Sequence, residues 1–228
     1  MNARTLLESA DAILVDLDGT LVDSTGPVRR AWQGFAERHG LDAEEVHRFA
    51  QGRPSRESIR LLAPDSDVEA ETAAVEEAEV TDTEGVVALP GAARLLATER
   101  PLAIVTSCSA ALAHARLTAA GLPIPKVLVS SDGLDRGKPD PACFLIAAGR
   151  LEIEPDRCVV LEDAPAGIRA GRAAGARVIA LRTTHADQEL SEADAIVDDV
   201  ACALSILAVR PTGGRPQTPG FVQSYWPG

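Results

Sequence analysis

Short runs of apolar residues recur along the chain, and most are followed by stretches in which apolar residues repeat at helical spacing. Continuous apolar runs are typical of strands buried in a parallel sheet. The predicted strands cover residues 12–16, 102–106, 126–130, 158–162, 177–181 and 195–197. The predicted helices cover residues 110–120, 141–151 and 166–174, and Gly121 and Gly175 end two of them. This alternation predicts an α/β fold with a Rossmann-like three-layer core, in which helices cover both faces of a mostly parallel sheet.

Residues 25 to about 88 lack this alternation. Trp32 and Phe35 belong to an apolar pattern at helical spacing, residues 67–80 are rich in Glu and Ala, and no further strand is predicted before residue 102. The pattern indicates a small α-helical cap inserted after the first strand, where it can act as a lid over the sheet. We therefore assign residues 1–22 and 90–209 to the core and 23–89 to the cap. Residues 210–228 are rich in Pro and Gly, which favours a disordered tail.

Charge and composition exclude some classes of partner. The net charge of −12 argues against nucleic acid as a partner, because nucleic-acid binders need a basic face, but it allows a small anionic ligand. No signal peptide is recognisable, and no apolar run approaches the ~18 residues that span a membrane. We expect a cytoplasmic protein without membrane contact, either a monomer or a homodimer. The cysteines show no metal-ligand spacing and are predicted to be reduced thiols; they are Cys108, Cys143, Cys158 and Cys202.

Two strands end in paired acids. The first leads into Asp16 and Asp18, and the strand at 158–162 ends in Glu162 and Asp163. The carboxyl ends of parallel strands are the edge at which open α/β folds bind ligands. Carboxylates at the end of a buried strand are costly unless a cation lies between them, and an all-oxygen site favours Mg²⁺. A shared metal site therefore explains both pairs better than capping of a helix by Asp163.

Two further segments at this edge suit an anion. Ser107 and Cys108 follow the strand at 102–106 and precede a helix, where hydroxyl and backbone N–H groups can bind a phosphate. A serine at this place can also be a plain helix cap. Lys138 lies between Gly137 and Pro139 on a constrained loop, so its charge can neutralise both a phosphate and the carboxylates. An ordinary surface lysine is the alternative.

These four segments, in this order, resemble the motifs of the haloacid dehalogenase superfamily. The resemblance rests on the run from Asp16 to Leu21 (DLDGTL), on Ser107, on Lys138 within Gly-Lys-Pro-Asp-Pro, and on the pair at 162–163, and it covers most of residues 12–181. The helical insertion looks like the small cap of the subgroup that contains sugar-phosphate phosphatases and β-phosphoglucomutase. The resemblance implies that Asp16 is a nucleophile forming an aspartyl-phosphate and that Asp18 is the general acid–base.

The resemblance also implies the ligands of the site. Mg²⁺ would be held by the two acidic pairs, through Asp16, the Asp18 carbonyl, Glu162 and Asp163. The phosphoryl group would be held by Ser107 and Lys138. Thr20 and Cys108 adjoin these positions and are further candidates for substrate binding. Cys108 departs from the family, because relatives usually have a small Gly or Ala there.

Substrate choice is expected to lie in the cap. Arg53 and Arg56 follow Gly52 on a turn that resembles the specificity loop of the family, and arginine suits recognition of an oxyanion. An arginine that pairs with Glu57 at the surface is the alternative.

The resemblance favours a Mg²⁺-dependent phosphatase of a small sugar or polyol phosphate, such as those acting on 2-deoxyglucose 6-phosphate or glycerol phosphate. A sugar phosphomutase of the β-phosphoglucomutase type is an alternative, weakened because residues 26–30 lack the mutase histidine and because Thr20 matches the phosphatases. A phosphoglycolate-type phosphatase is another alternative. A dehalogenase lacks Asp18, and a phosphonatase needs a cap lysine, whereas residues 1–100 contain no lysine. A non-catalytic protein with this fold is disfavoured, because every motif residue is present.

Overall fold

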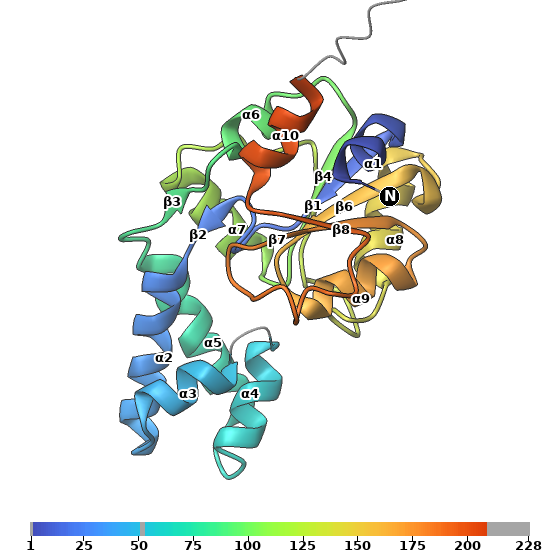
Figure 1. Cartoon of the computed structure of the whole chain (residues 1–228). Helices are drawn as coiled ribbons and strands as arrows, with labels where there is room; N and C mark the ends of the chain where they lie inside the picture. Colours follow the sequence, from blue (N-terminus) through green and yellow to red (C-terminus); the bar gives the residue numbers. More distant parts are fainter. Residues whose placement is uncertain (1, 51–52, 209–228) are drawn as a thin grey trace, which may run out of the picture.

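The computed structural model describes residues 2–50 and 53–208. Its main sheet has six parallel strands in the order β5-β4-β1-β6-β7-β8. All of them except β5 are labelled in Figure 1. These strands are β1 (Ala12–Val15), β4 (Leu102–Val105), β5 (Val127–Val129), β6 (Cys158–Glu162), β7 (Arg177–Leu181) and β8 (Ala195–Val197). The predicted parallel sheet is confirmed, and the observed strands match the predicted ranges to within two residues at each end.

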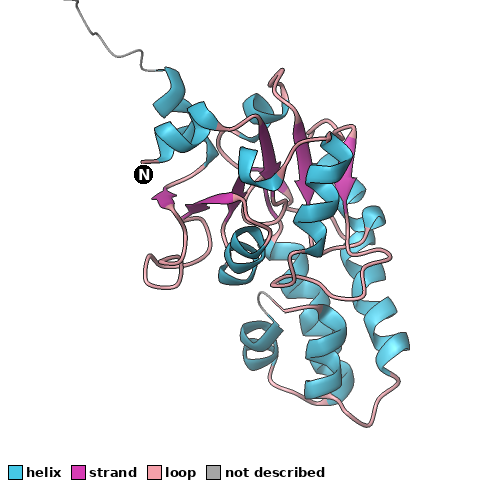
Figure 2. Cartoon of the chain, turned by 90° about the vertical axis from the view of Figure 1, so that its right-hand side faces the viewer, coloured by secondary structure: helices cyan, strands magenta, loops and turns pink. Residues whose placement is uncertain are grey.

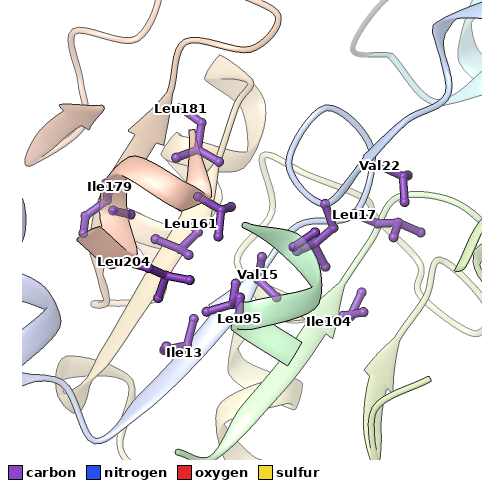
Figure 3. Close-up of a cluster of buried hydrophobic side chains, with 14 of the residues drawn as sticks. Ile13, Val15, Leu17, Val22, Leu95, Ile104, Leu161, Ile179, Leu181 and Leu204 are labelled. Carbon is purple, nitrogen blue, oxygen red and sulfur yellow. The ribbon is translucent and has the colours of Figure 1, made fainter. Parts of the chain in front are cut away.

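Alternate residues of each strand face two separate hydrophobic cores. Ile13 and Val15 of β1 lie in one core with Ile104 of β4 and Leu161 of β6 (Figure 3). Leu14 points to the other face, because successive side chains of a strand alternate. The first core is closed by α1 (Ala3–Ser9), α6 (Ala92–Leu96), α7 (Ala110–Ala119) and α10 (Val200–Ala208). The second is closed by α8 (Ala142–Leu151) and α9 (Pro165–Ala173). The predicted three-layer arrangement is therefore confirmed.

Strand order brings the two acidic pairs together. In sequence the chain runs from β1 to β4 and β5 on one side of the sheet, and then to β6, β7 and β8 on the other. The change of direction lies between β1 and β6, where open α/β sheets leave a crevice for a ligand. Val15 is in register with Leu161, and the N–H of Asp16 donates to the carbonyl of Leu161 at 3.0 Å. Asp16 and Glu162 therefore leave the sheet side by side.

The insertion after β1 is helical, as predicted. Its helices are α2 (Thr25–His39), α3 (Ala43–Ala50), α4 (Ser55–Leu62) and α5 (Val68–Thr81), and Figures 1 and 2 show them grouped beyond the end of the sheet. They enclose a hydrophobic core of their own, in which the rings of Trp32 and Phe35 meet edge to face at 5.5 Å. An independent core is what allows a cap to hold its shape apart from the sheet. The division of the chain at residues 22 and 90 stays a prediction.

The expectation of no strand between β1 and residue 102 is wrong. β2 (Val22–Asp23) and β3 (Val87–Ala88) pair antiparallel at the two ends of the insertion. Each has two residues, too few to show a period in sequence, and their pairing joins segments that are far apart in the chain. They connect the cap to the core at one place.

Several other predictions concern the whole chain. The predicted tail, residues 210–228, lies outside the described residues. In the part that the structure describes, no helix is both long and apolar enough to cross a membrane. All four cysteines are free thiols, as the absence of paired spacing led us to expect.

Candidate active site

A cleft of about 990 Å³ separates the carboxyl edge of the sheet from the cap. The core contributes Asp16, Asp18 and Lys138 to its lining, and the cap contributes Trp32 and Glu79 among others. All the other site residues predicted from the sequence also line it, with the exception of Thr20. Thr20 is buried, and its hydroxyl donates a hydrogen bond to Asp163. Segments more than 100 residues apart in the chain thus meet in one concave space, which is the usual form of a small-molecule site.

Lys138 lies between two carboxylates. Its Nζ is 2.5 Å from Oδ1 of Asp16 and 2.7 Å from Oε1 of Glu162, and it also donates to the Val105 carbonyl at 3.0 Å. The lysine side chain is 6% exposed. Burial lowers the pKa of Lys138, but the two carboxylates more than reverse this, and the pKa ends well above its usual value. Lys138 is therefore charged and is a partner of the site, so the surface alternative is wrong.

Asp163 is the most enclosed of the remaining acids, at 4% exposure. Its Oδ1 accepts a hydrogen bond from Thr20 Oγ1 at 3.2 Å, and its Oδ2 accepts one from the hydroxyl of Thr184. Gly19 permits this approach, because a Cβ at that position would lie 2.3 Å from Asp163 Oδ2. Burial, and then the charge of Glu162, raise the pKa of Asp163 to about 7 against the opposing hydrogen bond from Thr184. The helix-capping alternative does not hold, since the residue that caps α9 is Ala164.

The charges of the site do not balance. Asp16, Glu162 and Asp163 are all less than 10% exposed, and in the described part of the chain Lys138 is the one cation that forms an ion pair with any of them. Burial, reinforced by the neighbouring carboxylates and opposed by Lys138, raises the pKa of Asp16 well above its usual value. Excess buried carboxylate charge of this kind is relieved by a divalent cation, so the donor set fits Mg²⁺.

Glu162 is already engaged on both oxygens. Oε1 accepts from Lys138, and Oε2 accepts from the backbone N–H groups of Asp163 and Ala164, each at 2.9 Å. In this arrangement Glu162 orients Lys138, and its assignment as a metal ligand stays a prediction. Among residues 2–50 and 53–208, no three His, Cys, Asp or Glu side chains converge as a complete metal site. The further ligands that the resemblance implies, the Asp18 carbonyl, a phosphate oxygen and water, likewise stay a prediction.

In the serine-rich segment after β4, one serine caps a helix and a different serine faces the cleft. Ser109 caps α7, and its hydroxyl accepts from the N–H of Leu112 at 3.3 Å. Ser107 is exposed, lines the cleft and has no capping role, which leaves its hydroxyl available for a ligand. Cys108 is half-buried, with its Sγ 3.0 Å from the hydroxyl of Thr106, and burial raises the pKa of this thiol.

The two cap arginines have different surroundings. Arg56 forms an ion pair with Glu69 across helices α4 and α5 rather than with the predicted Glu57, and both side chains are more than half exposed. Arg53 lies over the ring of Phe49, with its guanidinium carbon 4.4 Å from the ring centroid. Both arginines line the cleft. The adjoining residues 51–52 of the predicted loop lie outside the described residues.

Sequence reasoning missed four residues of the site, three of which contact a predicted acid. Arg116 and Ser24 hold the carboxylate of Asp18, while Thr184 holds that of Asp163 and Thr183 donates to the carbonyl of Gly19. The threonines give no signal, because they lie in a loop between β7 and β8. Arg116 does give one, since it shares a helix face with the buried residues Leu112, Ala113 and Leu117.

Comparison with known proteins identifies the family of this site. A family model described as haloacid dehalogenase-like hydrolase matches residues 10–175. Hexitol phosphatase A of Escherichia coli is 46% identical over 81% of this chain and 88% of its own length. Validoxylamine A 7'-phosphate phosphatase of Streptomyces hygroscopicus is 39% identical over 82% of this chain and 92% of its own.

The solved structures agree. CbbY from Rhodobacter sphaeroides, in complex with phosphate, superposes with a TM-score of 0.76 at 28% identity, over 88% of this chain and all of the other. The family match covers the first acidic pair, the loop that carries Lys138 and the second acidic pair together. The chain therefore belongs to the haloacid dehalogenase-like hydrolases and is a phosphoric monoester hydrolase of that family.

Proposed function

We propose that this enzyme hydrolyses the phosphate monoester of a small sugar or polyol, with Mg²⁺ as cofactor and an aspartyl-phosphate as intermediate. The observation that carries the proposal is the buried carboxylate of Asp16, held by Lys138 at the point where the sheet changes direction and facing the cleft. A carboxylate that is fixed and partly desolvated beside a cation is well placed for attack on an anionic phosphate.

The reaction has two steps, transfer of the phosphoryl group to Asp16 and then its transfer to water. In the first, a carboxylate oxygen of Asp16 bonds to phosphorus, the bond from phosphorus to the alcohol oxygen breaks, and Asp18 gives its proton to that oxygen. In the second, Asp18 takes a proton from water, the water oxygen bonds to phosphorus, and the bond to Asp16 breaks. Phosphate leaves and both aspartates return to their starting states.

Other residues bind and orient the phosphate. The ammonium of Lys138 reduces the repulsion between Asp16 and the incoming phosphate, and the exposed hydroxyl of Ser107 can donate to a phosphoryl oxygen. Thr20 and Thr184 hold the carboxylate of Asp163 in place. When bound by Asp16, Asp163 and the Asp18 carbonyl, Mg²⁺ would neutralise charge on the phosphate and on the carboxylates.

A polyol or sugar is the substrate class that the relatives favour, because hexitol phosphatase A is similar over most of both chains. The phosphomutase alternative has less support from the site. The resemblance places the mutase histidine among residues 26–30, and the residue of that segment that lines the cleft is Val28, which cannot exchange a proton.

The test is release of inorganic phosphate from a panel of phosphorylated sugars and polyols, with Mg²⁺ and with EDTA. We expect turnover that needs Mg²⁺ and does not need a bisphosphate. Replacement Asp16→Asn should abolish it, because an amide is not a nucleophile towards phosphorus. The matched control is Asp156→Asn, an exposed aspartate in the turn before β6, at the opposite edge of the sheet.

Two results would contradict the proposal. Turnover of p-nitrophenyl phosphate by Asp16→Asn at the wild-type rate would exclude the covalent route. Absence of phosphate release by the wild type across the whole panel would exclude a sugar or polyol phosphatase.

A further inference from the structure

One arginine links the core to the cap. Arg116, in core helix α7, places Nη1 2.7 Å from Oδ2 of Asp18 and donates from Nη2 to Oε2 of Glu79 at 2.6 Å. Glu79 belongs to cap helix α5, which packs on α7. The arginine side chain is 5% exposed, the glutamate 8% and the aspartate 30%. Arg116 thus bridges a carboxylate of the reaction centre and a carboxylate of the cap.

The placement of these two charges is unusual for helices. The buried face of α7 consists of Leu112, Ala113, Arg116 and Leu117, and the buried residues of α5 are Val75 and Glu79. Each helix therefore has one charged residue on its buried face. Two desolvated charges are costly, and hydrophobic side chains of similar size would often stabilise such an interface as well or better. Folding alone does not account for the pair.

The contacts of Asp18 suggest what the pair does. Arg116 holds Oδ2, and the hydroxyl of Ser24 donates to Oδ1 at 2.7 Å. Arg116 and Ser24 therefore fix the orientation of the whole carboxylate. Ser24 immediately precedes cap helix α2, so both restraints on Asp18 depend on cap residues, one directly and one through Glu79.

We propose that Arg116 is a positioning residue that holds Asp18 for proton transfer, and that Glu79 holds Arg116 there while the cap lies on the core. The proposal rests on the proposed function, because it takes Asp18 as the acid–base. It adds a dependence of proton transfer on the cap, carried by one named ion pair between α5 and α7. Without Glu79, Arg116 keeps its contact with Asp18 but loses the second anchor that fixes its guanidinium plane.

The experiment measures how strongly the rate depends on the leaving group. The probes are phenyl phosphate and p-nitrophenyl phosphate, which differ little in shape but greatly in leaving-group basicity. The quantity compared is kcat/KM, which covers the steps up to loss of the alcohol. A basic leaving group needs the proton from Asp18, whereas p-nitrophenolate leaves readily without it.

We expect Arg116→Gln to lower kcat/KM for phenyl phosphate about tenfold more than for p-nitrophenyl phosphate, and Glu79→Gln to act in the same direction with a smaller effect. Arg116→Lys should bring the ratio of the two kcat/KM values part of the way back to that of the wild type, because a lysine keeps the charge but cannot form both contacts in one plane. The matched control is Arg38→Gln, which removes the ion pair of 2.8 Å with Glu71 inside the cap and touches no residue of the reaction centre. It should leave the ratio at the wild-type value.

The double variant Arg116→Leu with Glu79→Leu covers the case in which a single change prevents folding, since it leaves neither of these two charges buried. It should fold and show the same shifted ratio. A ratio equal to that of the wild type in folded Arg116 and Glu79 variants would overturn the proposal, whatever their stability. Failure of the proposed function is distinguishable, because the wild type would then release no phosphate from the panel of sugar and polyol phosphates, whatever the ratio of the two aryl esters.

Discussion

Nζ of Lys138 lies 2.5 Å from Oδ1 of Asp16, although the two residues are 122 positions apart in the chain. The contact makes the proposed nucleophile part of a buried ion pair rather than an isolated carboxylate. Glu162 shares the same ammonium group, so two carboxylates from two different strand ends depend on one positive charge.

Replacement of Lys138 should cost both stability and activity. Lys138→Met leaves Asp16 and Glu162 facing each other without a cation, and loss of one partner of a buried pair costs about 3–5 kcal/mol of unfolding free energy. Urea denaturation of the metal-free protein measures this, and phosphate release measures the activity. The chain has one other lysine, the exposed Lys126, so Lys126→Met is the matched control. Equal stability of the two variants would show that the ion pair contributes nothing to the fold.

Magnesium should stabilise the protein more at pH 8 than at pH 5.5. The pKa of Asp163 is about 7 in the folded, metal-free chain and near 3.8 when exposed, so the folded state binds more protons between these values. Stability of the metal-free protein therefore falls as pH rises towards 7, and Mg²⁺, which binds the ionised carboxylate, offsets the loss. Thermal unfolding with and without Mg²⁺ at both pH values measures the difference. Sodium chloride at the same ionic strength is the control, and an equal rise in Tm at pH 5.5 would contradict the assignment of Asp163.

Two helical glycines should respond in opposite ways to alanine. A Cβ at Gly167, in α9, would lie 1.6 Å from Oε1 of Glu162, so Gly167→Ala must displace the carboxylate that orients Lys138. We expect a loss of activity and of stability. Gly149, in α8, is exposed with nothing within 4 Å of the added atom, and Gly149→Ala should stabilise the protein by about 0.5–1 kcal/mol. Wild-type activity in Gly167→Ala would show that the position of Glu162 is not critical.

Replacement of the two cap arginines should affect substrate binding to different extents. Arg56 is paired with Glu69 in solvent, whereas Arg53 rests on the ring of Phe49 at the cleft. We expect Arg53→Ala to raise KM for the preferred sugar or polyol phosphate about tenfold, which is the loss of one charge-assisted contact. Arg56→Ala should change KM less than about twofold, because exposed ion pairs contribute little. A larger effect from Arg56→Ala would reverse the assignment.

Local pattern was sufficient for the sheet, the helices that cover it and the first site residues. The strand at 158–162 is predictable to the residue, since its apolar run ends at Glu162. The acids at the ends of β1 and β6 are visible as departures from the apolar runs. Parallel strands share one carboxyl edge, so placing the acids on strands also places them near each other. The pairing of β2 with β3 has no such local sign.

Residue order by itself determined the α/β core, the helical insertion and the position of the two acidic pairs, Ser107 and Lys138 at one edge of the sheet. Hydrophobic periodicity and the ends of strands are local properties of the sequence. Tertiary structure alone decided which groups share a charge. Lys138 binds Glu162 as well as Asp16, Arg116 meets Glu79 across two helices, and Thr184 reaches Asp163 from a distant loop. These contacts depend on how helices and loops pack in three dimensions, and a buried charge takes whichever opposite charge or donor the packing brings within reach.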